Sequence, residues 1–218
     1  MGTGLETAEA LIQIEHGSEI DAFEAATLLA DATGARLIAE LTRILRSGEK
    51  RSSREAAAYA LTWHNDRKAI EGLLTCASDH GERDSVRAQA VEGLAMHLEF
   101  DPARSRWRRR AEDLMIELLQ SPFPALRFWA CFGLGTLRSR RAVPRLRKLE
   151  RTDRSVCPGW WYVREEAEDA IWRIAGRAPQ DRLLVPMRRP GNTESDPSPK
   201  RRPARQFQTR TRREGGGR

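Results

Sequence analysis

The chain has 218 residues, with 38 Arg and Lys against 31 Asp and Glu and a net charge of +7. Its longest uncharged run near the middle, residues 128–137, spans ten residues, half of the ~20 that a membrane-spanning helix needs. The chain does not begin with a basic segment and an apolar core, so no secretory signal is expected. We therefore expect one cytoplasmic domain that does not interact with a membrane.

The net charge is unevenly distributed along the chain. Residues 1–103 carry a net charge of −8, residues 104–154 carry +9, and residues 177–218 carry +8. A charge asymmetry of this kind indicates an acidic or polyanionic partner and is uninformative about the fold.

Apolar residues recur every three or four positions along most of the chain, as in Leu37, Leu41 and Ile44. This spacing places them on one face of an α-helix. Leu and Ala together number 50, while Val and Ile number 15, which favours helix over strand because β-branched side chains lose rotamer freedom in a helix. The sequence predicts short helices joined by tight turns.

The sequence also contains internal repeats. Residues 54–74 align without a gap with residues 127–147, and the arginines that begin the two segments are among six identical pairs. Two more copies of the first half follow elsewhere in the chain. The repeated arginines are spaced by 33, 40 and 37 residues, at Arg54, Arg87, Arg127 and Arg164. This is the period of a solenoid built from helix pairs.

The repeated unit reads V-R-x-x-A-x-x-x-L, with R-x-A-(I/V)-x-x-L further along. It resembles HEAT repeats, in particular the HEAT-like class of phycobiliprotein lyases, within the armadillo-type superfamily. The resemblance covers about residues 20–176 and implies an all-α fold, a right-handed α-α solenoid of about four and a half helix pairs. Repeat one lacks the arginine, as a capping repeat can, and repeat three carries an insertion at residues 99–106.

We expect residues 1–176 to form this solenoid and residues 177–218 to form a disordered tail rich in Arg and Pro. Within the solenoid we expect an N-terminal helix in residues 1–19 and repeats near residues 20–50, 51–80, 82–120, 121–154 and 158–176.

The four repeated arginines are interpreted as residues that stack one repeat on the next. The alternative is a ladder of anion-binding sites, but a residue that occurs once per repeat most often serves the stacking interface. Its long stem can pack on apolar surface while its guanidinium binds neighbouring loops. By similar reasoning Asp66 is interpreted as the N-cap of the following helix, and not as an acid catalyst.

Seven basic residues form a candidate binding surface for a partner or polyanion. Arg141, Arg145 and Lys148 share one helix face, and four arginines surround Trp107 one repeat earlier. The resemblance implies that the second helix of each pair lines a concave docking surface, with Trp107 able to stack on a base or on an Arg plane. The alternative is a solvated surface of salt bridges. The complete set is Arg106, Arg108, Arg109, Arg110, Arg141, Arg145 and Lys148.

Two other regions allow a binding and a structural interpretation each. In the tail, Arg201 and Arg202 belong to basic runs that could neutralise phosphates, or the tail is a solubilising appendage. Trp160, Trp161 and Tyr162 are either interface anchors or a plug for the open end of the solenoid, which we favour because an uncapped end exposes the core.

The sequence contains no recognisable catalytic constellation. Its four histidines lack the spacing of a metal site, and no Walker loop or dinucleotide fingerprint is present. Cys76, Cys131 and Cys157 form no C-x-x-C pair and are expected to be free, buried thiols. We expect neither an enzyme nor a cofactor.

The leading hypothesis is a monomeric HEAT-repeat scaffold or adaptor that binds an acidic protein partner on a concave basic face. The first alternative is sequence-independent nucleic-acid binding through the Arg-rich strip and the tail. A bilin lyase-like activity, implied by the family resemblance alone, is the second alternative.

Overall fold

The computed structural model describes residues 4–64, 66–99, 101–102, 105–178 and 182. These residues form ten α-helices and one short 3₁₀ helix, η1. The tail beyond residue 182, including Arg201 and Arg202, lies outside the described residues, so its disorder stays a prediction. The elements are α1 (Gly4–His16), α2 (Glu19–Leu29), α3 (Ala35–Ser47), α4 (Arg51–Leu61), α5 (Arg67–Ser78), α6 (Asp84–Leu98), α7 (Arg106–Leu118), α8 (Pro124–Thr136), η1 (Arg140–Ala142), α9 (Val143–Thr152) and α10 (Val163–Ile174).

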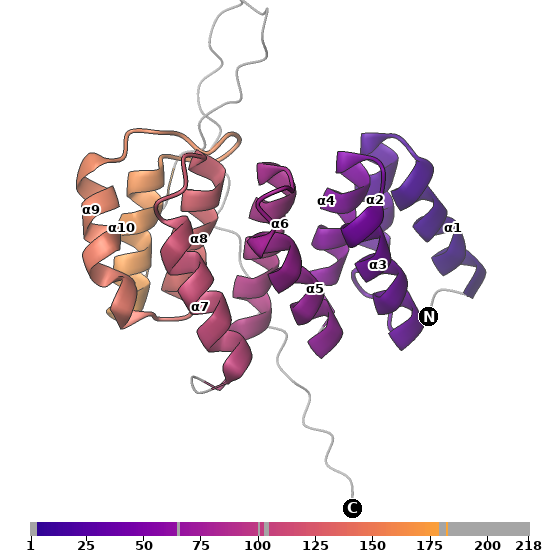
Figure 1. The fold of residues 1–218 in the computed structure, drawn as a ribbon, viewed down its shortest axis with the longest axis horizontal. Coiled ribbons are helices and arrows are strands. Elements are labelled where there is room, and N and C mark those ends of the chain that lie inside the picture. Colours follow the sequence, from indigo (N-terminus) through magenta and orange to yellow (C-terminus); the bar gives the residue numbers. More distant parts are fainter. Residues whose placement is uncertain (1–3, 65, 100, 103–104, 179–181, 183–218) are drawn as a thin grey trace, which may run out of the picture.

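The helices form an α-solenoid, as predicted (Figure 1). The helices pack as the pairs α1/α2, α3/α4, α5/α6, α7/α8 and α9/α10, whereas α2 with α3, α4 with α5, α6 with α7 and α8 with α9 make little contact. The expected repeat boundaries, which pair α2 with α3 and so on, are therefore shifted by one helix. Each pair buries its apolar face against its neighbours, since a single helix pair cannot enclose a core of its own.

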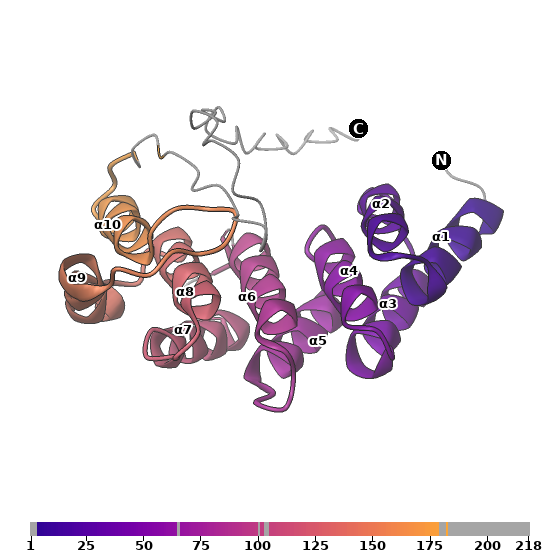
Figure 2. The same ribbon diagram turned by 90° about the horizontal axis from the view of Figure 1, so that it is seen from above.

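The helices stand in two rows, and the array is curved (Figure 2). One row consists of α2, α4, α6, α8 and α10 and lines the concave side; we call it the inner row. The outer row consists of α3, α5, α7 and α9. Neighbouring helices pack more closely within the inner row than within the outer row, as curvature towards the inner row requires.

Small residues permit this close packing in the inner row. Helix α4 buries Ala56, Ala57, Ala58 and Ala60, and α8 approaches α10 at a glycine. A methyl group on Gly135 would lie 2.8 Å from the Cα atom of Ala170. Glycine is therefore required at this position by the neighbouring backbone.

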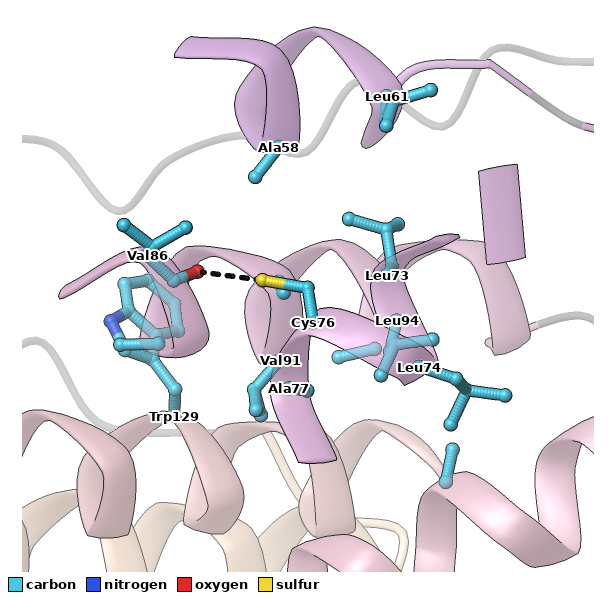
Figure 3. Close-up of a cluster of buried hydrophobic side chains, with 14 of the residues drawn as sticks. Ala58, Leu61, Leu73, Leu74, Cys76, Ala77, Val86, Val91, Leu94 and Trp129 are labelled. Carbon is cyan, nitrogen blue, oxygen red and sulfur yellow. Dashed lines mark hydrogen bonds between the residues drawn. The ribbon is translucent and has the colours of Figure 1, made fainter. Parts of the chain in front are cut away.

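The core is continuous along the solenoid. Between the second and third helix pairs it contains Leu61 of α4, Leu73 and Cys76 of α5, and Leu94 of α6, with Trp129 of α8 at the edge of the cluster (Figure 3). The Cys76 thiol contacts the carbonyl oxygen of Val86 at 4.0 Å. All three cysteines are free and buried, as predicted.

Side-chain caps fix several helix starts. Ser18 and Asp21 form a reciprocal capping box at α2, which satisfies two backbone N–H groups at the exposed helix end. Asp66 accepts a hydrogen bond of 2.7 Å from the Lys68 N–H group, so its prediction as an N-cap is confirmed. Ser105 caps α7 in the same way, accepting from the Trp107 N–H group at 3.2 Å.

Candidate functional site

Two of the repeated arginines join consecutive helix pairs through their loops. Arg54 binds both carboxylate oxygens of Glu82, at 2.6 and 2.9 Å, and also donates to the carbonyl oxygen of Gly48 at 2.7 Å. Arg127 repeats the arrangement, donating to Asp153 at 2.7 Å and to the Ser121 carbonyl oxygen at 2.6 Å. Each guanidinium therefore ties the loop before its helix to the loop that follows the next helix.

Burial alone would raise the pKa values of Glu82 and Asp153 because it disfavours the charged carboxylate. Hydrogen bonds from Arg54 to Glu82, and from Arg127 and Ser155 to Asp153, outweigh that effect, so both carboxyl pKa values lie below their ordinary values. Both carboxylates are ionised at neutral pH and make charge-assisted hydrogen bonds to the arginines.

The other two repeated arginines have incomplete versions of this arrangement. Arg87 is buried and donates to the Ala77 carbonyl oxygen at 3.1 Å; the loop that would supply its acid, residues 119–123, contains no carboxylate. Arg164 belongs to the last described helix, and its guanidinium lies 4.9 Å from the ring centroid of Tyr162.

The repeat register defines the surface that faces the concave side. Helices α4, α6 and α8 are each covered on three sides, by the inner helices before and after them and by the outer row, so their remaining side faces the concavity. In α6 the partly exposed residues of that side lie two positions before and two, five and nine positions after the repeated arginine. We call these positions in the four arginine-containing helices the inner stripe: Ser52, Ala56, Tyr59 and Trp63; Ser85, Gln89, Glu92 and Met96; Ala125, Trp129, Phe132 and Thr136; and Tyr162, Glu166, Asp169 and Arg173.

Contacts between helices support this assignment. The Arg173 guanidinium lies 5.2 Å from the ring centroid of Phe132. Met96, Phe132, Thr136 and Arg173 also line one hollow of about 310 Å³ between α6, α8 and α10. Five of the sixteen stripe residues are aromatic, three are acidic and one is basic.

Comparison with known proteins agrees with this architecture. A family model described as HEAT repeats matches residues 80–172. Residues 80–172 therefore carry HEAT repeats. No curated protein matches the chain.

Three solved structures superpose on the chain to different extents. A chain of the complex of CpcE and CpcF of phycocyanin lyase from Nostoc sp. PCC7120 superposes with a TM-score of 0.63 and 18% identity, covering 78% of this chain and 99% of that chain. An engineered protein gives a TM-score of 0.49 at 19% identity, over 78% of this chain and 79% of that one. Human deoxyhypusine hydroxylase in complex with glycerol gives 0.40 at 20% identity, over 80% and 75%.

The HEAT-repeat array places the seven candidate binding residues on the outer side of the solenoid. They belong to α7, η1 and α9, and α7 and α9 stand in the outer row (Figure 2). The expectation that these residues line the concave face is therefore wrong, because α7 and α9 are each the first helix of their packed pair, and the second helix of each pair lines the concave side. The closely packed, alanine-rich helices that carry the repeated arginines line it instead.

The seven residues do not have the same surroundings. Arg108 is used by the fold: its guanidinium donates to the carbonyl oxygens of Leu98, Glu99 and Asp101, at 2.6, 3.2 and 2.9 Å, and to that of Leu137 at 2.6 Å. It thereby closes the insertion of repeat three and ties it to the end of α8.

Arg141 is exposed but paired. It forms ion pairs with Asp113 at 2.9 Å and Glu112 at 3.5 Å, both on α7. The remaining five residues are exposed and form no ion pair with another described residue. We call these five the basic strip: Arg106, Arg109 and Arg110 on α7, and Arg145 and Lys148 on α9.

Trp107 is buried, with 8% of its surface exposed. The Arg106 guanidinium lies 4.4 Å and that of Arg110 5.8 Å from its ring centroid. Of the two stacking partners expected for this ring, the structure contains the Arg plane; stacking on a base would require the Arg106 side chain to move off the ring.

The aromatic turn after α9 packs against α8. The Trp160 ring lies 5.1 Å from that of Trp129, and the Trp161 ring lies 5.5 Å from that of Phe128. Trp161 also donates to the buried carboxylate of Glu166 at 3.0 Å. The turn therefore packs on the core beside α8, and its interpretation as a plug for the open end beyond α10 stays a prediction.

The three cysteines and His64 are buried, and His97 is partly buried. Burial raises the pKa of the Cys76 and Cys157 thiols to about 12 and that of Cys131 well above its ordinary value, so these thiols are protonated at neutral pH. Burial also lowers the pKa values of His64 and His97. No group of His, Cys, Asp and Glu within the described residues could hold a metal ion. No described helix is both long and apolar enough to cross a membrane.

Sequence reasoning missed two features of this surface. The first is the inner stripe. The alanines beside the repeated arginines were a usable signal for it, because helices of small residues approach closely and form the inner side of a curved array. The second is Arg182, which sequence reasoning assigned to the tail. It binds Asp169 at 2.7 Å and Glu168 at 2.6 Å on α10.

Proposed function

We propose that this HEAT-repeat protein is an interaction scaffold whose basic strip docks an acidic surface of a protein partner. The observation that carries the proposal is the charge of the outer row. Its helices, with η1, contain fifteen basic and six acidic residues, against six basic and ten acidic residues in the inner row. Within the outer row, the basic strip combines the exposed cations of α7 with those of α9, the next helix of that row.

An acidic protein fits the basic strip better than a nucleic acid does. Binding of single-stranded nucleic acid without sequence preference relies on aromatic rings that stack on bases, and Trp107 is covered. Phosphate contacts alone remain for the nucleic-acid alternative, and they would give a steep loss of affinity with salt.

The architecture supports a protein partner in a second way. The Nostoc chain with the same fold takes part in a complex of two proteins. At 18% identity this likeness supports the fold alone, so a bilin lyase-like activity has no residue of this chain as support and stays the last alternative.

The test compares two charge-reversal variants of the full chain. Arg145→Glu with Lys148→Glu changes the basic strip, and Arg36→Glu with Arg46→Glu changes two exposed basic residues of α3 by the same amount of charge. Partners are captured from extract of the native host, with and without nuclease treatment, and quantified by mass spectrometry. Affinity is measured for a polyglutamate peptide and for a 20-base-pair DNA duplex.

We expect the strip variant to lose the captured partner and to bind polyglutamate at least tenfold more weakly, while the α3 variant keeps both. Equal binding by the two variants would contradict the proposal. Capture that disappears after nuclease treatment, with tighter binding of the duplex, would replace it with the nucleic-acid alternative.

A further inference from the structure

The concave side of the solenoid has the opposite character to the outer row. The inner stripe combines acidic and aromatic side chains, and its one cation, Arg173, is held by Glu166 at 2.6 Å. Of its three carboxylates, Glu92 is partly exposed, while Glu166 and Asp169 are buried and bind Arg173 and Arg182. At the N-terminal end of the stripe the rings of Phe23, Tyr59 and Trp63 follow one another, with centroids 6.0 and 6.1 Å apart. Trp63 is 45% exposed. Carboxylates and exposed ring faces are the two groups that bind a guanidinium most specifically.

The far end of the inner row already binds one arginine from beyond the last helix. In α8 the residues one and four positions after the repeated Arg127 are Phe128 and Cys131, and both are buried. In α10 the same positions are Glu165 and Glu168. Arg182 binds there, through the Glu168 carboxylate at 2.6 Å and the Glu165 carbonyl oxygen at 3.3 Å.

Arg182 also reaches the stripe itself. It donates to both carboxylate oxygens of Asp169, at 2.7 and 3.2 Å, and its side chain is 11% exposed. Asp169 occupies the same repeat position as Phe132, Glu92 and Tyr59. Arg182 therefore lies at the α10 end of the concave face.

From this placement we propose that residues 183–218 bind along the concave face as its arginine-rich occupant. The segment contains ten Arg and Lys against three Asp and Glu, a net charge of +7. This charge complements the exposed and partly exposed carboxylates of the inner row, Glu19, Asp21, Glu24, Asp84 and Glu92. This interaction surface is separate from the basic strip and goes beyond the function proposed for it.

The segment is long enough for this role. Four helix-to-helix steps at about 9–10 Å each separate α10 from α2, so the inner row spans about 40 Å. Thirty-six residues reach about 120 Å when extended, and twelve of them already span the row. The basic run that begins at Lys200 can therefore lie anywhere on the stripe.

Lys200 supplies a direct test, because it is the one lysine in this segment. A carbodiimide joins an amine to a carboxylate only when the two are in contact, and mass spectrometry identifies the joined peptides. In the full chain we expect Lys200 to be joined to inner-row carboxylates such as Glu24 or Glu92, and at most a tenth as often to Glu71 and Glu117 of the outer row. The yield should fall at least threefold in 0.5 M salt, since screening weakens exposed charge pairs.

Two variants and one mixing experiment complete the test. Lys200→Arg keeps the charge and should remove the joined peptides, whereas Arg182→Ser releases the anchor and should lower their yield at least threefold. Peptides joined equally to both rows, or to the outer row alone, would overturn the proposal. So would joined peptides of mixed isotope composition when isotopically heavy and light protein are combined, because they would place a second copy on the concave face.

Discussion

Replacing Arg127 with methionine should destabilise the solenoid more than any substitution in the basic strip. The Arg127 side chain is 14% exposed and that of its partner Asp153 is 7% exposed. Methionine keeps the apolar stem but leaves a buried carboxylate with Ser155 as its remaining described partner. It also removes the 2.6 Å hydrogen bond to the Ser121 carbonyl oxygen.

The expected loss follows from the cost of stranding a buried charge. Removing one partner of a buried ion pair costs about 3–5 kcal/mol, and we take about 3 kcal/mol because Ser155 still donates to Asp153. For a chain of this size that loss lowers Tm by about 6–12 °C. The pKa of Asp153 is held below its ordinary 3.8, so the stabilisation is complete above that value and is lost as the pH falls through the lower folded pKa.

The assay is urea unfolding followed by circular dichroism at neutral pH, with Arg145→Met as the matched control. Arg145 is exposed and forms no ion pair with another described residue, so its substitution should change the free energy of unfolding by less than about 0.5 kcal/mol. Equal effects of the two substitutions would refute the assignment of Arg127 to repeat stacking. A double-mutant cycle with Asp153→Asn should give a coupling energy of at least about 1 kcal/mol.

Three further predictions concern packing, pH dependence and surface charge. Gly135→Ala should destabilise the protein by about 1–3 kcal/mol through overpacking against Ala170, despite the higher helix propensity of alanine, and unfolding curves would check this. Burial raises the pKa of Glu166 from 4.5 to about 7, against the opposing effect of the Arg173 charge. The contribution of Glu166 to stability is therefore complete below pH 4.5 and is lost as the pH rises through 7. Over that range the free energy of unfolding of the wild type should fall by up to about 3 kcal/mol relative to that of Glu166→Gln. Arg145→Glu with Lys148→Glu should leave Tm within about 2 °C of the wild type, and a larger shift in a thermal scan would make these residues structural.

The fold could be predicted because its information is local and repeated. The arginines at 54, 87, 127 and 164 and the apolar periodicity recur in each unit, so one recognised unit predicts the whole array. The partners of Arg54 and Arg127 were harder to predict, because Glu82 and Asp153 lie more than 25 residues away in loops whose positions depend on the stacking itself.

The assignment of faces failed because curvature depends on both rows at once. The positive charge of α7 and α9 was visible in the sequence, but its side of the solenoid depends on which row packs more tightly. That property comes from the alanines of α4 and from contacts such as that of Gly135 with Ala170. Arg108 was misassigned for a related reason, since its carbonyl partners are brought together only when the insertion of repeat three folds back.

The most direct test of the account is a carbodiimide crosslinking map of the full chain with its captured protein partner. Of the four lysines, Lys148 belongs to the basic strip, while Lys50 donates to the carbonyl oxygens of His16 and Gly17. We predict crosslinks from Lys148 to carboxylates of the partner, and their loss in Lys148→Arg. A partner joined through Lys50 or Lys68, and never through Lys148, would contradict docking on the basic strip.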